Sequence, residues 1–269
     1  MGIGVILGTL LVVTTRAWAL AWLGLELNLI SFLPYALSSE RQKKRAINYF
    51  IIQRCGSLLL LLGGLLLDKL LAASTVIILG LVIKMGLIPL HFWVPGVVSS
   101  LKAWPLYILL SWQKVAPVAL LIFTAIKHTW LIVVNAGLGA LTMLTTASIP
   151  LLLVFRGILQ IAWVNSLRGG FLTYYMGLYF LGLALVILFM TQPSQNIVWA
   201  LLNSGGLPPL TGFMIKLKAL TRLRSGLSIF LLSRRGAALT TYSRFLVNVP
   251  FTSWLVHPVV LLVGGVGIV

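Results

Sequence analysis

Apolar runs of about 20 residues, joined by short Gly-, Pro- and Ser-marked loops, follow one another along almost the whole chain. Such runs are long enough to cross the hydrocarbon core of a bilayer as helices, which satisfy every backbone N–H and C=O internally. A transmembrane β-barrel would instead show short segments of alternating hydrophobicity. The pattern therefore predicts an all-α polytopic membrane protein.

The composition supports this prediction, because 60% of the residues are hydrophobic and only 9% are charged. A soluble domain has about 25% charged residues. We expect helices near residues 2–15, 18–37, 47–67, 74–94, 103–126, 130–147, 150–167, 171–190, 195–217, 227–247 and 253–269. No linker separates them, so we expect one transmembrane domain over residues 1–269, with about 10–11 helices.

The net charge of +17 does not indicate nucleic-acid binding, because the basic residues are spread between apolar runs without an aromatic-basic motif. Basic loops indicate orientation, and they contact anionic lipids such as cardiolipin. By this rule residues 38–46 and 95–102 lie on the same, positive-inside face as the N-terminus. The N-terminus resembles a first helix rather than a cleaved signal. Cys55 is the only cysteine, so we expect neither an intrachain disulfide nor a metal site.

The chain contains three carboxylates, and one of them lies at membrane depth. Glu40 and Asp68 lie at the edges of apolar runs, whereas Glu26 lies inside the run of residues 18–33, which has no other charge. An ionised carboxylate at this depth costs at least ~2.5–3.5 kcal/mol on insertion scales. It persists where a partner or a proton makes it tolerable, so Glu26 is a candidate functional residue.

Three lysines also fall inside apolar runs, namely Lys84, Lys114 and Lys216. The alternative for each is a side chain that snorkels to the membrane surface near a helix end. Lys216 fits that alternative best, because Lys218 and Arg222 follow closely. We nevertheless take all three as candidates for an ion path.

Two of these lysines stand beside interruptions of their helices. The break residues are Gly86 and Pro89 after Lys84, and Gly205, Gly206, Pro208 and Pro209 before Lys216. Non-helical backbone at membrane depth is tolerated only where it is buried in protein or lines a watery cavity. Two broken spans, one in each half of a chain, are typical of inverted-repeat transporters. Two ordinary proline kinks are the alternative.

Proton movement is the chemistry that needs these residue types. Burial disfavours the charged form of a lysine, and a nearby carboxylate favours it. At an effective dielectric of ~20, an ion pair at about 4 Å is worth roughly 4 kcal/mol. Making and breaking a Glu26–Lys84 pair would therefore switch the lysine between holding and releasing its proton, with Lys114 and Lys216 continuing the path. His91, beside the first break, either relays protons or hydrogen-bonds a freed carbonyl.

Five motifs, in order over residues 16–216, resemble the chain 2 family of mitochondrial NADH:ubiquinone oxidoreductase. The motifs are residues 22–34 (WLGLELNLISFLP), 39–40 with 48–53 (SE and NYFIIQ), 84–95 (KMGLIPLHFWVP), 112–117 (WQKVAP), and 205–213 (GGLPPLTGF) with Lys216. The chain is similar to the short animal form of this subunit. It departs from the family at Gly96, Gly157 and Ser166, where an acidic residue, a lysine and a histidine are usual.

The resemblance implies an antiporter-like core subunit in the membrane arm of respiratory complex I, in the mitochondrial inner membrane. In that family the carboxylate matching Glu26 pairs with the lysine matching Lys84, and the lysines matching Lys114 and Lys216 continue a polar axis. The resemblance also implies that flavin, iron–sulfur clusters and the quinone site belong to partner subunits, with no cofactor on this chain. The expected partners are other membrane-arm subunits, including neighbouring antiporter-like ones.

Two other functions remain open from the sequence. The chain is either a structural membrane-arm subunit that pumps no protons itself, or a free-standing cation/proton antiporter. The antiporter is the weaker alternative, because about ten helices do not make a full inverted repeat.

Overall fold

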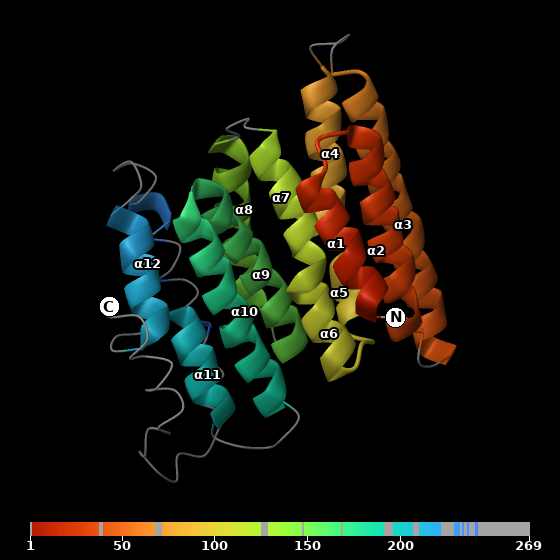
Figure 1. Cartoon of the computed structure of the whole chain (residues 1–269). Coiled ribbons are helices and arrows are strands. Elements are labelled where there is room, and N and C mark those ends of the chain that lie inside the picture. Colours follow the sequence, from red (N-terminus) through yellow and green to blue (C-terminus); the bar gives the residue numbers. More distant parts are fainter. Residues whose placement is uncertain are drawn as a thin grey trace. The chain divides into compact units, whose positions relative to one another are not determined.

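The structure, a computed structural model, contains helices and no strand in the part of the chain that it describes (Figure 1). It describes residues 2–37, 40–67, 72–124, 129–146, 148–167, 169–190, 196–206, 210–221, 229–231, 233, 236 and 240–241. The prediction of an all-α protein is confirmed. The chain divides into two compact units, Met1–His128 and Thr129–Val269. Each is described by itself, and the single domain stays a prediction.

The first unit contains seven α-helices and one 3-10 helix within its described residues. They are α1 (Gly2–Thr14), α2 (Trp18–Ala36), α3 (Glu40–Leu65), α4 (Ala73–Met85), α5 (Trp93–Val98), α6 (Ala103–Leu110), η1 (Trp112–Lys114) and α7 (Val115–Phe123). The described part of the second unit contains α8 (Thr129–Thr145), α9 (Ile149–Ser166), α10 (Gly170–Met190), α11 (Asn196–Gly205) and α12 (Thr211–Thr221).

Five segments among the described residues are long and apolar enough to cross a membrane. They are Trp18–Ala36, Lys43–Leu65, Ala103–Phe123, Ile149–Ser166 and Gly170–Met190. Large apolar side chains point outward from them, such as Ile30, Leu62 and Leu181. An outward apolar surface is what a lipid-facing helix requires, so the chain is a multi-pass membrane protein.

The helix boundaries differ from the prediction mainly at the interruptions. The helix expected over 74–94 ends at Met85, and the one expected over 195–217 is divided into α11 and α12. The helix expected over 103–126 is also divided, at Ser111, whose hydroxyl lies 2.5 Å from the Tyr107 carbonyl oxygen. Pro117 follows in the first turn of α7, where its missing N–H leaves no hydrogen bond unmade. The helix expected over 253–269 and most of 227–247 lie outside the described residues.

In the first unit, α3 packs against α2 on one side and against α4 on the other. The approach of α3 to α4 depends on two glycines, because a Cβ added at Gly80 would lie only 2.8 Å from the Gly56 carbonyl oxygen. Lys84 lies one turn beyond Gly80, so this contact sets the distance of Lys84 from α3.

At one end of the unit, Nη1 of Arg45 donates a 2.9 Å hydrogen bond to Ser99. The described residues 40–46 therefore lie at the same end as residues 95–102.

In the second unit, α8 packs against α9, while α11 packs against both α10 and α12. The most enclosed helix is α9, which buries a continuous stretch from Leu152 to Val164. Two polar side chains, Arg156 and Gln160, lie within that stretch and are separated by one helical turn. A buried arginine in the middle of an apolar helix is the first sign of a polar site in this unit.

Candidate functional site

The first predicted helix break is formed by Gly86, which ends α4 in the left-handed conformation with φ of 63°. The N–H of Leu87 bonds back to the Val82 carbonyl at 3.0 Å, which completes a Schellman motif. The break leaves carbonyls of the last turn without a helical partner. Gln53, on α3, supplies one by donating a 3.2 Å hydrogen bond to the Lys84 carbonyl.

Lys84 and Lys114 line one small cavity in the first unit, with a volume of about 20 Å³. Both side chains are buried, with 8% of their surface exposed. The polar groups of Tyr49, Gln53 and Gln113 complete the lining. A cavity of this size with several polar partners suits one water molecule. The structure thus brings two of the three predicted lysines to the same polar site.

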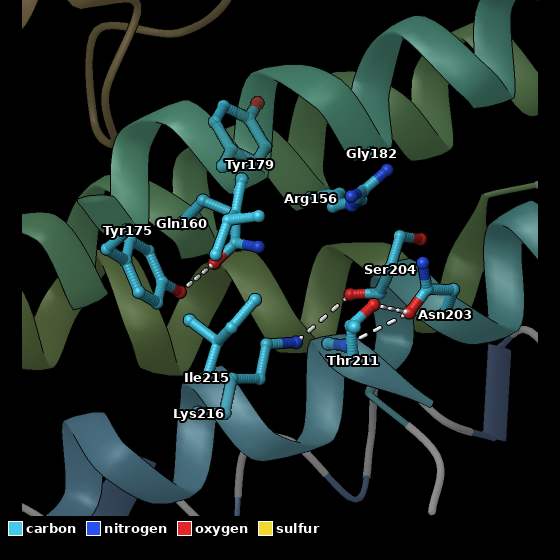
Figure 2. Close-up of a pocket in the computed structure, with 12 residues that line it drawn as sticks. Arg156, Gln160, Tyr175, Tyr179, Gly182, Asn203, Ser204, Thr211, Ile215 and Lys216 are labelled. Atoms are coloured by element: carbon cyan, nitrogen blue, oxygen red, sulfur yellow. Dashed lines mark hydrogen bonds between the residues drawn. The ribbon is translucent and has the colours of Figure 1, made fainter. Parts of the chain in front are cut away.

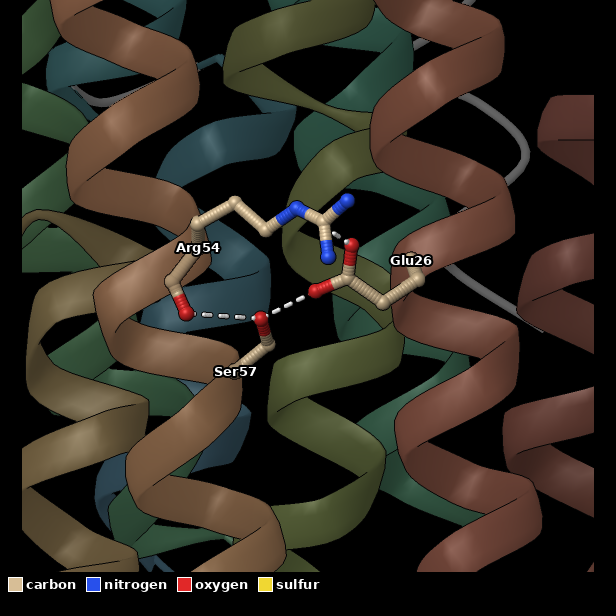
Figure 3. A network of polar contacts seen from close by, with 3 residues as sticks. All are labelled: Glu26, Arg54 and Ser57. Atoms are coloured by element: carbon tan, nitrogen blue, oxygen red, sulfur yellow. Dashed lines mark hydrogen bonds and ion pairs between the residues drawn. The ribbon is translucent and has the colours of Figure 1, made fainter.

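Glu26 is held by α3 through two contacts, which Figure 3 shows. Nε of Arg54 lies 3.2 Å from Oε2 of Glu26 in an ion pair, and the Ser57 hydroxyl donates to Oε1. The guanidinium also stacks over the Phe50 ring at 5.3 Å. Glu26 is buried, whereas the Arg54 side chain is 41% exposed.

The structure corrects the predicted Glu26–Lys84 ion pair, since Arg54 is the partner of Glu26 among the described residues. The physical reason is that a guanidinium is always charged and presents several donors to a carboxylate. Lys84 still interacts electrostatically with both Glu26 and Arg54. The carboxylate therefore acts on Lys84 through space rather than through a direct contact.

A further hydrogen bond joins α2 to the segment that carries Lys114. Nε2 of Gln113 donates to Oδ1 of Asn28 at 2.9 Å, and Asn28 lies two residues along α2 from Glu26.

His91 lies in the loop before α5, is partly exposed, and is not among the residues that line the Lys84 cavity. Its role as a proton relay stays a prediction.

The second predicted break is formed by Gly206, with φ of 83°, directly after α11 ends at Gly205. Nζ of Lys216 donates to two carbonyls of this helix end, those of Ser204 at 3.1 Å and Gly205 at 3.0 Å. The carboxyl end of a helix carries partial negative charge, so it stabilises an ammonium group. The break thus creates the acceptors that hold buried Lys216. Pro208 and Pro209 lie outside the described residues.

The side chain of Asn203 connects the end of α11 to the start of α12. Its Oδ1 accepts hydrogen bonds from the Thr211 hydroxyl at 2.9 Å and from the Gly212 N–H at 3.0 Å (Figure 2). A Cβ at Gly212 would overlap the Asn203 carbonyl oxygen. Asn203 therefore acts as an N-terminal cap for α12 and fixes the position of Lys216.

Lys216 lines a cavity of about 40 Å³ that is built entirely within the second unit (Figure 2). The other polar side chains at its wall are Arg156, Gln160, Tyr175, Tyr179, Asn203, Ser204 and Thr211. The Tyr175 hydroxyl donates a 2.5 Å hydrogen bond to Oε1 of Gln160. The Arg156 guanidinium lies 5.7 Å from the centre of the Tyr179 ring.

Sequence reasoning missed two charged residues, Arg54 and Arg156, both of which lie inside predicted apolar runs. The signal was the same one that identified the lysines, a charge surrounded by apolar residues. The neutral groups Gln53, Asn28 and Asn203 gave no comparable signal, because amides are far less costly than charges at membrane depth.

The chain is similar to curated proteins named NADH-ubiquinone oxidoreductase chain 2, although no protein-family model matches it. It is 31% identical to the protein of that name from Molossus ater, over 84% of this chain and 77% of the relative. It is 30% identical to the one from Cardioderma cor over the same shares, and 29% identical to the one from Lumbricus terrestris, of which 78% is covered.

Solved structures share the fold at lower identity. A chain of respiratory complex I from Thermus thermophilus with bound aureothin superposes with a TM-score of 0.75 at 19% identity, covering 98% of this chain and 74% of that one. A chain of the Mrp complex from a Dietzia species gives a TM-score of 0.81 at 14% identity, covering 93% and 60%. The predicted antiporter-like bundle with breaks after Lys84 and before Lys216 is confirmed, and the division between α6 and α7 is a third interruption that was not predicted.

Proposed function

The chain belongs to the NADH-ubiquinone oxidoreductase chain 2 family, and from this premise we propose that it is a core membrane-arm subunit of respiratory complex I. It would sit in the mitochondrial inner membrane among other membrane-arm subunits, including antiporter-like ones, and contact anionic lipids such as cardiolipin. NADH oxidation and ubiquinone reduction would take place in partner subunits, which would hold the flavin, iron–sulfur and quinone groups. This chain would contribute a path for protons.

One observation carries the proton path: three buried lysines, Lys84, Lys114 and Lys216, line polar cavities within an otherwise apolar helical protein. Ionisable side chains at membrane depth are rare outside ion and proton paths. Lys84 and Lys216 also adjoin the two left-handed glycines that interrupt helices. Interrupted helices around buried charges are the usual architecture of coupled transport.

In the first unit, the electrostatic field at Lys84 comes from the Glu26 carboxylate and from Arg54, the permanently charged partner of that carboxylate. Glu26 favours the charged form of the lysine, and Arg54 opposes it. Because the Arg54 side chain is partly exposed, it has room to move relative to Glu26. If Arg54 moved away from Glu26, Lys84 would hold its proton more tightly. The return of Arg54 to Glu26 would favour release of that proton toward Lys114.

In the second unit, Lys216 uses backbone acceptors in place of a carboxylate. Its ammonium donates to the carbonyls of Ser204 and Gly205, and loss of the proton would remove part of that attraction. A rearrangement of the break at Gly206 would therefore change how tightly Lys216 holds its proton. Electron transfer in partner subunits would drive these rearrangements.

The proposal is tested by neutralising the lysines in the assembled complex and measuring protons moved per NADH oxidised in proteoliposomes. Lys216→Met is expected to lower this ratio, since methionine keeps the apolar stem but carries no proton. Lys218→Met is the matched control, because Lys218 lies on the same helix with an exposed side chain. For Lys84→Met, exposed Lys102 provides the corresponding control.

Two outcomes would overturn the proposal. If the variants lower the amount of assembled complex on a native gel while leaving the proton ratio of that complex unchanged, the chain is a structural scaffold. If the chain does not migrate with an NADH-oxidising complex at all, a free-standing antiporter becomes the better explanation.

A further inference from the structure

The second unit has an unbalanced charge. Residues 129–269 contain nine lysine and arginine residues but no aspartate or glutamate. A buried cation in this unit therefore has no carboxylate of its own unit with which to pair. A side-chain counter-charge must come from outside the segment.

Arg156 is the residue most affected by this imbalance. Its side chain is 3% exposed, and its Nε and Nη1 have no hydrogen-bond partner among the described residues. The guanidinium does contact the face of the Tyr179 ring. A cation–π contact of this kind compensates only part of the lost hydration. A lysine in the same place could become neutral by releasing its proton, but an arginine remains charged at any physiological pH.

Arg156 and Lys216 line the same cavity (Figure 2), whose volume is about 40 Å³. One water molecule needs about 10–15 Å³ on this scale, so the cavity has room for a small ion with a water. Its wall adds neutral donors, namely the side-chain amides of Gln160 and Asn203. Two cations, neutral donors and no carboxylate describe a site that favours an anion.

We propose that this cavity binds a small monovalent anion of the size of chloride, held between the Arg156 guanidinium and the Lys216 ammonium. The anion supplies the charge that the second unit lacks. It also couples to Lys216, because an anion at this place stabilises the protonated lysine, and loss of that proton weakens anion binding by the same factor. The site itself does not depend on the proposed proton path, since Arg156 requires a counter-charge in either case.

The test uses crystals of the purified complex that contains this chain, with chloride replaced by bromide, and locates bromide by its anomalous scattering. We expect an anomalous peak in contact with the Arg156 guanidinium, and we expect it to be occupied at physiological salt. Arg156→Gln should raise the half-saturating bromide concentration by at least about tenfold. Lys218→Met, which removes an exposed cation from α12, the helix that carries Lys216, should leave the peak unchanged.

A second variant keeps the test informative if Arg156→Gln does not assemble. Gln160 lies one turn after Arg156 and also lines the cavity, so Gln160→Glu places a carboxylate beside the guanidinium. The new carboxylate can still accept the Tyr175 hydrogen bond. Bromide should then be displaced while both cations remain.

Three results would overturn the inference. The first is an absence of bromide at Arg156 when bromide is visible elsewhere in the crystal, or its presence only far above physiological salt. The second is a carboxylate of a neighbouring subunit bonded to Arg156. The third is a bromide peak that persists in Gln160→Glu.

Discussion

Replacing Gly80 by alanine tests whether the close contact of α3 and α4 positions Lys84. The added Cβ would lie 2.8 Å from the Gly56 carbonyl oxygen and 2.9 Å from Cγ of Leu60. Relaxed contacts of a carbon atom are about 3.5–4.0 Å, so α4 must move by roughly half an ångström or more. The first obstacle is backbone, which cannot turn aside as a side chain can.

The expected destabilisation follows from two opposing effects. Overpacking of this kind costs about 1–3 kcal/mol, and alanine in a helix interior returns roughly 0.5–1 kcal/mol relative to glycine. Taking values near the middle of both ranges, a net loss of about 1–2 kcal/mol remains. The same movement would lengthen the hydrogen bond from Gln53 to the Lys84 carbonyl, which at 3.2 Å is already near the upper limit for such a bond. We therefore also expect fewer protons per NADH in the assembled complex.

The stability change is measured as the melting temperature of the purified full chain in detergent, followed by circular dichroism. For a chain of this size, about 1–2 kcal/mol corresponds to a decrease of roughly 2–8 °C. Gly177→Ala is the matched control, because Gly177 lies within α10 and a Cβ there would meet no atom within 4 Å. An equal melting temperature for Gly80→Ala and Gly177→Ala would refute the reasoning.

Three further substitutions probe the other contacts of the site. Asn203→Ala leaves the donors of Thr211 and Gly212 without their acceptor, so it should lower the free energy of unfolding by about 1–3 kcal/mol. Asn203→Asp keeps the acceptor oxygen and should recover most of that loss in the same melting assay. Arg54→Gln should lower the free energy of unfolding by about 1–2 kcal/mol, which is less than for a fully buried ion pair because the guanidinium is partly exposed. An unchanged melting temperature would contradict the ion pair. Gly86→Ala should lower the free energy of unfolding by about 1–2 kcal/mol through the left-handed backbone alone, measured by the same melting assay against Gly177→Ala.

The parts of the fold that could be predicted are those that depend on local sequence. Hydropathy located α2, α9 and α10 closely, because a membrane helix satisfies its own backbone and needs no partner to form. The breaks at Gly86 and Gly206 were predictable for a similar reason, since each glycine adopts a left-handed conformation that other residues avoid.

The parts that could not be predicted depend on which helix faces which. The division at Ser111 lies within residues 103–126, which hydropathy predicts as one helix, and only the local backbone reveals it. The ion pair of Glu26 with Arg54 requires that α3 turn its Arg54 side toward α2, a fact that hydropathy does not contain. The sequence located the buried charges Glu26, Lys84, Lys114 and Lys216, whose functional role stays a prediction, but it paired Glu26 with Lys84 instead of Arg54.

The two units stabilise a buried ammonium by different physical means. Lys84 depends on a carboxylate, whose influence is set by its distance to one partly exposed arginine. Lys216 depends on the carbonyls of Ser204 and Gly205, whose partial charge is permanent and whose position is fixed by the Asn203 cap. In the proposed path, a side-chain movement would change the charge state of Lys84, whereas Lys216 would respond only if the helix break itself rearranged. Substitutions at Arg54 should accordingly act on the first lysine alone, and substitutions at Asn203 on the second.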